Sequence, residues 1–512
     1  MRTLLVISSS FVLFSVIVST GAVAADGRLQ FRVNDAQGQP LPCRIHVADG
    51  EGKAWQAAGL PFWRDHFVCS GQAALELPPG TYRYTVERGP EYESASGSVD
   101  IASDGQTTRS LELNRIANLR DSGWYSADLH VHRAVSDIEL LMSAEDLDYA
   151  PVITWWNRTN PWTTRAPPES VLRQFDGHRL YHVMAGEDER EGGALLYFGL
   201  RRPIDITQAT REFPSAMHFV RQAKIQNANV WIDMEKPFWW DVPTWLATGQ
   251  MQSIGLANNH MWRSEMLPNE AWGKPRDTER LPNPLGNGYW TQEIYYHILN
   301  SGLRIPPSAG SASGVLGNPV GYNRVFAKVD GEFTEDAWWS SLARGNCFVT
   351  NGPLIVCHAN DQLPGTVFQM DDGDRLLLEL KIELLGRDRV EHVEVIKNGI
   401  VAQTLDCSAA AFQQLTTKLS FSEPGWFLIR AIADNDATFR FGSTGPYYVE
   451  FPGNRHRISR ASTVFFEQWV AERIDRVRRN VTDPQQLDAV LQPHETAREF
   501  WKQRRQMANV DD

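Results

Sequence analysis

Cysteine is scarce in this chain of 512 residues, which has five, at positions 43, 69, 347, 357 and 407. Thiols so few and so far apart exclude a disulfide-dense scaffold and a metal site built from thiolates. In an oxidising compartment Cys43 could pair with Cys69, and Cys347 with Cys357, which would leave Cys407 free. The sequence leaves both the paired and the reduced states open.

Positive charge is also in deficit, because 50 lysines and arginines face 62 aspartates and glutamates. The formal net charge is −12 and the pI is about 5.6. This acidic balance argues against nucleic acid and against an anionic membrane surface as partners. We expect a small-molecule or glycan substrate instead.

The apolar run over residues 4–18 is short for a membrane-spanning helix. Arg2 precedes it, and the small residues Gly-Ala-Val-Ala-Ala follow it at 21–25. This order is typical of a secretory signal, with an uncleaved membrane anchor as the alternative. We predict that residues 1–25 are a signal peptide, that the rest is periplasmic or extracellular, and that it does not associate with a membrane once the signal is removed.

The remaining chain is too long for one compact core, so two to four domains are expected. Residues 26–116 alternate apolar and polar side chains between turn formers, which predicts an N-terminal β-sandwich. Within it, Leu-Pro-Pro-Gly-Thr-Tyr at 77–82 resembles the regulatory-like modules of carboxypeptidases. Residues 353–455 return to this pattern, with an Asn-Gly hairpin signal at 398–399, and predict a C-terminal β-sandwich. Residues 456–512 have a helical spacing of apolar side chains, and we assign this helical tail to packing.

Residues 117–352 differ, because apolar strand-like runs alternate there with helices that have recognisable caps. We expect strands over 124–131, 151–156, 180–185, 194–200, 230–234 and 253–257, and helices over 138–149, 215–227 and 290–300. Repeated β-then-α units predict a parallel sheet or a barrel. The predicted fold class is therefore α/β, with the central domain flanked by two β-sandwiches.

The sharpest local feature of the central domain is Asp-Leu-His-Val-His at 128–132. Residues two apart on a strand face the same side, so His130 and His132 project together while Leu129 and Val131 enter the core. Two imidazoles pointing in one direction suit Zn, Mn or Fe.

Polar side chains recur where the predicted strands end. They are His130, His132, Asn157, Glu187, Asp188, Glu189, Arg190, Asp233, Glu235, Lys236, Asn258, Asn259, His260, Ser311 and Ser313. In barrel-type α/β domains this rim holds the active site. The pattern therefore predicts a site of several convergent carboxylates and imidazoles.

These stretches resemble the CehA/McbA-like metallohydrolases of the PHP (polymerase and histidinol phosphatase) superfamily over residues 123–353. The matching parts are residues 127–132, the Gly-Glu pair at 186–187, the strand end at Asn258 and Val-Thr-Asn-Gly-Pro at 349–353. The resemblance implies a distorted seven-stranded β/α barrel that binds one to three divalent metals and hydrolyses phosphoesters or carbamates.

The chain departs from this family at three motifs. The usual Thr-Asp-His is Thr-Trp-Trp at 154–156, the His-Pro motif reads Glu-Lys-Pro at 235–237, and the terminal Gly-Ser-Asp-x-His resembles Gly-Ser-Ala-Ser at 310–313. A full trinuclear centre is therefore not expected. What the resemblance leaves is a smaller site of His130, His132 and Glu187, with His260 or Glu235 as a further ligand.

Three protein ligands and a water are enough for a catalytic zinc-like ion. Whichever of Glu187 and Glu235 is not a ligand would act as general base or acid. Arg133, Arg190 or Lys236 could stabilise a developing anion, or could simply pair with nearby carboxylates. The stretch 267–288, rich in Gly, Pro and Asn, could form a lid.

Tryptophan is abundant, with 18 residues, many of them between 155 and 339. These indoles are either large core residues or the walls of a cleft for a ring or sugar. Two alternatives to the metal-dependent hydrolase follow. One is a metal-free carbohydrate-active or carbohydrate-binding protein, whose two carboxylates would be Glu187 and Glu235; the other is a catalytically inactive PHP-like scaffold.

Overall fold

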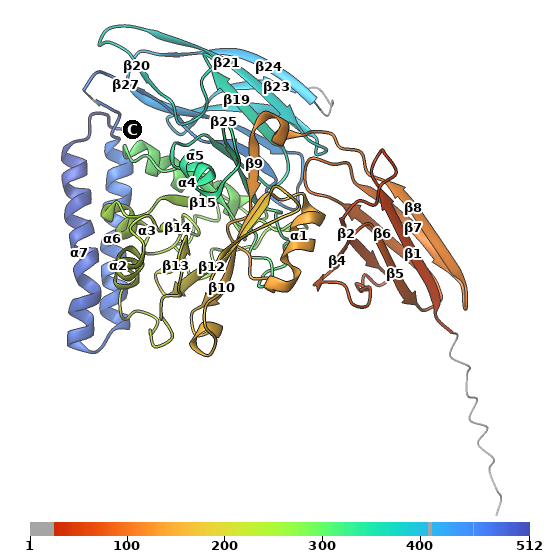
Figure 1. The fold of residues 1–512 in the computed structure, drawn as a ribbon. Coiled ribbons are helices and arrows are strands. Elements are labelled where there is room, and N and C mark those ends of the chain that lie inside the picture. Colours follow the sequence, from red (N-terminus) through yellow and green to blue (C-terminus); the bar gives the residue numbers. More distant parts are fainter. Residues whose placement is uncertain (1–24, 408–411, 454) are drawn as a thin grey trace, which may run out of the picture.

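The computed structural model describes residues 25–407, 412–453 and 455–512 (Figure 1). Apart from Ala25, the predicted signal peptide of residues 1–25 lies outside them. The predicted mixed α/β class is confirmed, with strands in several sheets and two long helices at the C-terminal end. Among the residues described, no helix is both long enough and apolar enough to cross a membrane.

The N-terminal part consists of two sheets around a common core. The five-stranded sheet has the order β3-β4-β2-β6-β7 and the three-stranded sheet the order β5-β1-β8. Their strands are β1 (Gly27–Asn34), β2 (Cys43–Ala48), β3 (Phe62–Trp63), β4 (His66–Cys69), β5 (Gln72–Leu77), β6 (Gly80–Glu87), β7 (Ala95–Ile101) and β8 (Gln106–Glu112). The alternation expected from the sequence holds: Leu29, Phe31 and Val33 of β1 are buried, and the residues between them are not.

The central strands belong to one 16-stranded sheet that continues into the C-terminal part. Its main path runs β16-β15-β14-β13-β12-β10-β9-β17-β18-β26-β25-β22-β23. The central strands are β9 (Trp124–Ala127), β10 (Tyr149–Trp156), β11 (Leu172–Phe175), β12 (Arg179–Arg190), β13 (Gly193–Phe198), β14 (Trp231–Met234), β15 (Ser253–Ala257), β16 (Pro307–Ala309), β17 (Arg324–Lys328) and β18 (Cys347–Thr350). The boundary predicted at 352 and 353 therefore falls within a continuous sheet.

The expected parallel pairing is found in part: β10 is parallel to β12 and β14 to β15, but β13 is antiparallel to both β12 and β14. The turn of Glu191 and Gly192 between β12 and β13 is too short for the crossover that parallel pairing requires. No closed barrel is found in the described part of the chain, so the predicted PHP-type barrel is not confirmed.

The strand predicted over 124–131 ends early, at Ala127. Beyond it, the Leu129 amide donates to the Ala309 carbonyl (3.0 Å) and the His132 amide to the Ser313 carbonyl (2.8 Å). Val131 forms isolated parallel bridges with Val152 and with Ser313. Residues 129–132 consequently lie between β10 and the end of β16.

The helices of the central part are short. They are α1 (Ile138–Glu145), α2 (Ala216–Gln226), α3 (Val242–Thr248), α4 (Gly286–Asn300) and α5 (Glu335–Ala343), with 3-10 turns η1 (Leu119–Ser122), η2 (Val135–Asp137) and η3 (Pro161–Thr163). The predicted helix over 138–149 stops at Glu145, because Asp146 has a left-handed backbone (φ 49°) that ends the helix. Ser215 and Thr334 cap α2 and α5 through their hydroxyls.

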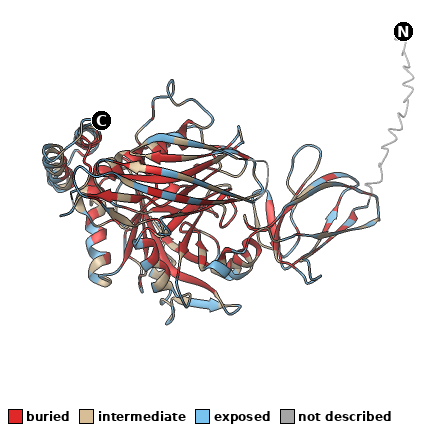
Figure 2. Ribbon diagram, turned by 90° about the horizontal axis from the view of Figure 1, so that it is seen from above, coloured by how far each residue is buried: buried red, intermediate tan, exposed pale blue. Residues whose placement is uncertain are grey.

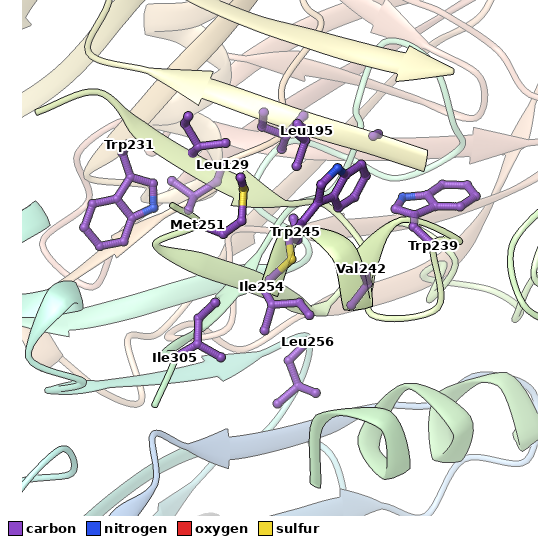
Figure 3. Packing of buried hydrophobic residues seen from close by; sticks show 14 of the residues in the cluster. Leu129, Leu195, Trp231, Trp239, Val242, Trp245, Met251, Ile254, Leu256 and Ile305 are labelled. Carbon is purple, nitrogen blue, oxygen red and sulfur yellow. The ribbon is translucent and has the colours of Figure 1, made fainter. Parts of the chain in front are cut away.

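The core of the central part is rich in indole rings. Trp239 and Trp245 pack with Leu195 of β13 and with Ile254 and Leu256 of β15 (Figure 3). Ile254 and Leu256 are two apart on their strand and are both completely buried. Every residue of β13 and β15 is buried, as expected for strands covered on both faces.

The C-terminal strands form a second layered region, which Figure 1 shows above the central part. A three-stranded sheet with the order β19-β21-β24 shares a hydrophobic core with strands of the long sheet. The strands are β19 (Leu354–Ala359), β20 (Val367–Gln369), β21 (Leu376–Leu385), β22 (Val390–Lys397), β23 (Ile400–Asp406), β24 (Phe412–Phe421), β25 (Gly425–Ala433), β26 (Phe441–Thr444) and β27 (Tyr447–Glu450). The predicted hairpin at 398–399 joins β22 and β23.

Two helices close the chain, α6 (Arg460–Asn480) and α7 (Pro484–Gln506). Their outer faces are exposed and their inner faces buried, as the colours of Figure 2 show. Phe466 and Trp469 of α6 are buried, Trp501 of α7 stacks on Phe466, and its indole N–H donates to the carbonyl of Pro243 (2.9 Å). The predicted packing role of the tail agrees with these contacts.

All five cysteines are free thiols. Cys43 and Cys69 lie directly opposite one another on β2 and β4, with 3.7 Å between their sulfurs.

Candidate metal centre

The segment at 128–132 is held by a buried carboxylate. Oδ1 of Asp128 accepts from the amides of His130 (3.0 Å) and Ser311 (2.9 Å), and Oδ2 accepts from the amide of Gly321 (2.7 Å). Burial raises the pKa of Asp128, although these donors oppose the shift. Asp128 thereby ties the end of β9 to the loop after β16 and fixes the direction of the two histidines.

Two glycines allow close packing around the candidate site, one against His130 and the other against Trp155. A Cβ on Gly310 would lie 2.4 Å from Cβ of His130, and one on Gly186 would lie 1.8 Å from the ring of Trp155. Only glycine fits such contacts. The Gly-Glu pair noted in the sequence thus has a packing reason, which places Glu187 at its position on β12.

Three ligand-type atoms converge at this point. Nε2 of His130 lies 3.0 Å from Nε2 of His132, and Oε2 of Glu187 lies 3.4 Å and 3.1 Å from these two nitrogens. His130 and Glu187 are buried and the side chain of His132 is 8% exposed. Ligands at about 2.0–2.1 Å from one tetrahedral ion are about 3.3 Å apart, so this triangle has the size of a zinc-like site.

Contacts within the protein satisfy these three atoms only in part. At most one of the two facing Nε2 atoms can donate to the other, and Oε2 of Glu187 has no hydrogen-bond partner in the ranges described. A buried carboxylate oxygen without a donor is costly. A cation in the triangle would satisfy all three atoms.

Glu235 lies on the opposite side of the His130 ring. Its Oε1 is 3.3 Å from Nδ1 of His130, it accepts from Nζ of Lys236 (2.6 Å), and its Oε2 accepts from the indole N–H of Trp239 (2.9 Å). A carboxylate at Nδ1 keeps the proton there and leaves the lone pair of Nε2 directed at the triangle. Sequence reasoning offered Glu235 as a ligand or a base, whereas this geometry makes it an orienting group for His130.

The charges of the cluster shift its pKa values strongly. Burial lowers the pKa of His130, but Glu187 and Glu235 outweigh burial and raise it to about 10. Burial lowers the pKa of His132. Burial raises the pKa of Glu235, but Lys236 and His130 outweigh burial and lower this pKa to about 2. Burial also raises the pKa of Glu187, but His130 and His132 outweigh it and lower this pKa as well. Without an ion, the proton of His130 supplies the positive charge of the site.

The other predicted site residues lie around this triangle and not in it. Nδ1 of His260 bonds to the carbonyl of Asn269 (3.0 Å), and this histidine is outside the group of three ligands. Lys236 is occupied by Glu235 and lies over the Trp239 ring at 4.5 Å. His260, expected as a further ligand, is thus outside the group of three, and Lys236, expected to stabilise an anion or to pair with a carboxylate, is paired with Glu235.

The two predicted arginines have structural partners. Arg190 binds both carboxylate oxygens of Asp188, at 2.5 Å and 2.7 Å, and donates to the carbonyl of Pro214 (2.7 Å). Arg133 lies over the ring of Trp63 at 5.5 Å. The contacts of Arg190 agree with the ion-pairing alternative, whereas Arg133 forms no ion pair with any described residue.

Sequence reasoning counted Trp156 only among the indoles of a core or a cleft, and it mentioned Glu189 only as one of the polar rim residues. The ring of Trp156 lies 5.0 Å from that of His132, and its N–H donates to Oε2 of Glu189 (3.2 Å). Burial, and then Glu187, raise the pKa of Glu189 to about 8. Period-two spacing on β12 could have identified Glu189, because residues 187 and 189 share one face of a strand.

Comparison with known proteins gives little. No family model matches the sequence. No curated protein matches it either. Solved structures with weak similarity include a CARDB domain from Pyrococcus furiosus in complex with di-metal ions (17% identity, 19% of this chain and 94% of that one, TM-score 0.14) and the Bacillus anthracis TIE protein (8% identity, 84% and 51%, TM-score 0.15). A Bacteroides uniformis beta-glucuronidase 3 matches at 10% identity over 81% of this chain and 60% of that one, with a TM-score of 0.16. TM-scores this low indicate no shared fold.

Proposed function

We propose that this chain is a secreted metal-dependent hydrolase that uses a single divalent ion, held by His130, His132 and Glu187. The observation that carries the proposal is the convergence of three buried ligand atoms, one of them an oxygen without a hydrogen-bond donor. Imidazole and carboxylate ligands suit Zn, Mn or Fe. Such an ion, when bound, would lower the pKa of its water toward neutrality for attack on a phosphoester, ester or carbamate bond.

The residues around the ligands have defined tasks in this proposal. Glu235 orients His130, and Lys236 and Trp239 hold Glu235. Glu189, two residues from Glu187 on β12, is a further carboxyl available for proton transfer. The indole N–H of Trp156 positions the carboxyl of Glu189. Proton transfer by Glu189 takes the place of the role first expected for Glu235.

We further propose that the central strands correspond to a distorted PHP-type barrel. Its seven strands would be residues 124–132, β10 and β12–β16. The position of residues 129–132 between β10 and β16 supports this arrangement. The predicted signal peptide places the protein in the periplasm or outside the cell in this proposal.

The metal-free glycosidase is less well supported. Its two carboxylates would need to be roughly 5–10 Å apart with the sugar between them. Glu187 and Glu235 instead contact the two nitrogens of one imidazole, so the ring of His130 fills the space between them.

Metal content measured by plasma mass spectrometry tests the proposal, on full-length protein purified without added metal. We expect about one Zn, Mn or Fe per chain in the wild type and none in His130→Ala/His132→Ala. The matched control is His46→Ala/His66→Ala, which removes two histidines from another cluster and should keep the ion. Wild-type protein without metal, even after reconstitution, would overturn the proposal. If the wild type does contain metal, the metal-loaded protein is assayed on model phosphoesters and carbamates.

A further inference from the structure

A cleft of about 630 Å³ opens beside the candidate metal centre. It is lined by the ends of β10 and β12, by residues 206–211 and by Trp272 of the loop before α4. This volume is within the usual range for small-molecule sites, roughly 300–1,000 Å³. The cleft is therefore large enough for a ligand with one or two rings.

The inner wall of the cleft is shared with the metal centre. Trp156 lines the cleft, and its ring lies 5.0 Å from that of His132. Glu189, the acceptor of the Trp156 N–H, also lines the cleft. A ligand lying against Trp156 would thus have one end next to the proposed ligand triangle.

The outer wall is an exposed indole that is held in place. Trp272 is 38% exposed, yet it stacks on Trp239 with ring centroids 5.0 Å apart. Its N–H donates to the carbonyl of Arg190 (3.1 Å), and its own carbonyl accepts from the indole of Trp240 (2.6 Å). A large aromatic ring fixed at the surface of a cleft offers a rigid face for another ring. The stretch expected as a lid thereby contributes a wall.

The cleft carries excess positive charge. Its lining has three arginines and one carboxyl, that of Glu189. Arg190 is paired with Asp188 and Arg211 with Glu191, whereas exposed Arg158 has no hydrogen bond or ion pair to any residue that the structure describes. Arg158 is the cation of the cleft whose donors are free for a ligand.

We infer that this cleft binds small aromatic anions, with the ring between Trp156 and Trp272 and the negative group on the guanidinium of Arg158. Apolar lining from Ile206 and Ala209 favours an aromatic ring over a sugar. A role of such anions as substrates rests on the proposed function. Their binding to the cleft does not depend on it. The planar guanidinium suits a carboxylate, which it can hold through two parallel hydrogen bonds.

Isothermal titration of the full chain with 2-naphthoate and with neutral 2-naphthamide tests the inference. We expect saturable binding of naphthoate, and binding of the amide weaker by about tenfold or more, because a hydrogen bond to a charged group contributes about 1.5–3 kcal/mol. Arg158→Gln should reduce naphthoate affinity to that of the amide. Arg202→Gln is the matched control, because Arg202 is exposed and its side chain has no partner in the described structure.

Two further measurements separate the parts of the inference. Trp272→Ala should weaken both ligands while Trp272→Phe restores most of the affinity, as expected for a ring contact. Naphthoate binding should persist in His130→Ala/His132→Ala, so a failure of the metal proposal would not affect the cleft proposal. A protein that contains metal but does not bind naphthoate would contradict the cleft proposal and leave the metal proposal unaffected. Unchanged naphthoate affinity in Arg158→Gln, or tighter binding of glucuronate than of naphthoate, would overturn the inference.

Discussion

The residues that the structure describes include two histidine–carboxylate clusters of similar size, and only one of these two has the properties of a metal site. In both the ligand atoms lie within 4.8 Å of one another: His130, His132 and Glu187 in the first, His46, Asp65 and His66 in the second. Composition and distance alone do not separate them. The hydrogen-bond partners of the histidine nitrogens distinguish the two clusters.

The second cluster is a complete hydrogen-bonded chain. Nε of Arg44 donates to Nε2 of His46 (3.1 Å), Nδ1 of His46 contacts Asp65 (3.1 Å), and Nδ1 of His66 contacts the same carboxylate (2.8 Å). Because Nε2 of His46 accepts, its proton must be on Nδ1, and neither nitrogen of His46 has a lone pair free for an ion. In the first cluster the two Nε2 atoms face each other, and an oxygen lacks a donor.

The locations of the clusters fit this difference. The second is part of the contact between the N-terminal sheets and the central part, where the indole of Trp63 donates to the carbonyl of Leu316 (2.6 Å). Nearby, Glu87 accepts from Arg44 (2.7 Å), Arg263 (2.8 Å) and Arg387 (3.0 Å). The N-terminal cluster therefore stabilises an interface, while the central one lies next to a cleft.

The largest expected effect comes from removing the carboxylate of the first cluster. Glu187→Gln replaces a ligand with a neutral amide, so metal content should fall from about one ion per chain to nearly none. Asp65→Asn makes the same change in the second cluster and should leave the metal content unaltered. Equal losses in both variants, measured by plasma mass spectrometry, would remove the distinction between the clusters.

The next largest effect is expected at the interface near the second cluster, on stability and not on metal content. Glu87→Gln leaves three buried or half-buried arginines without their shared carboxylate, which should lower the free energy of unfolding by about 3–5 kcal/mol. Metal content should not change. Urea unfolding monitored by circular dichroism measures this loss. Glu76→Gln is the control, because the ion pair of Glu76 with Arg28 is exposed and contributes little to stability. A Glu87→Gln protein as stable as wild type would contradict the structural role of the interface.

A smaller effect is expected for Glu235, which contacts the proposed ligand His130 and not the ion itself. Glu235→Gln keeps the size of the side chain but weakens its bond to Nδ1 of His130, so metal affinity should fall by about 10- to 100-fold. Competition with a fluorescent chelator measures this affinity. A variant that loses the ion as completely as Glu187→Gln would mean that Glu235 is itself a ligand.

Much of this arrangement could be predicted from the sequence, and the exceptions have physical reasons. His130 and His132 converge as expected, although the strand on which that expectation rested ends at Ala127, and it was the family resemblance that pointed to Glu187 through the Gly-Glu pair. The antiparallel β13 was not foreseen, because the predicted strand ended at 185, whereas β12 continues to Arg190 and leaves only Glu191 and Gly192 for the turn. The group of three that the described residues form leaves out Glu235 and His260, and a ligand role for them stays a prediction, because which nitrogen of an imidazole a carboxylate meets depends on tertiary packing.

The smallest expected effect is a difference in pH dependence. Burial, with Arg44 and His46, lowers the pKa of His66 to about 3, whereas the carboxylates around His130 raise its pKa to about 10. A folded pKa below the unfolded value of about 6.5 means that the stability from neutral His66 is present above pH 6.5 and is lost as pH falls toward 3. His130 acts in the opposite direction in metal-free protein, since its contribution is complete below pH 6.5 and declines as pH rises toward 10.

Comparing wild type with His66→Gln isolates the first of these terms, because His130 contributes equally to both proteins. Between pH 7 and pH 5, at a limit of about 1.4 kcal/mol per pH unit, metal-free wild type should lose about 1–2 kcal/mol of unfolding free energy relative to the variant. Urea unfolding at the two pH values gives the difference. If His66→Gln followed the same pH dependence as wild type, His66 would not be buried in its neutral form, and the two clusters would no longer differ in how they hold protons.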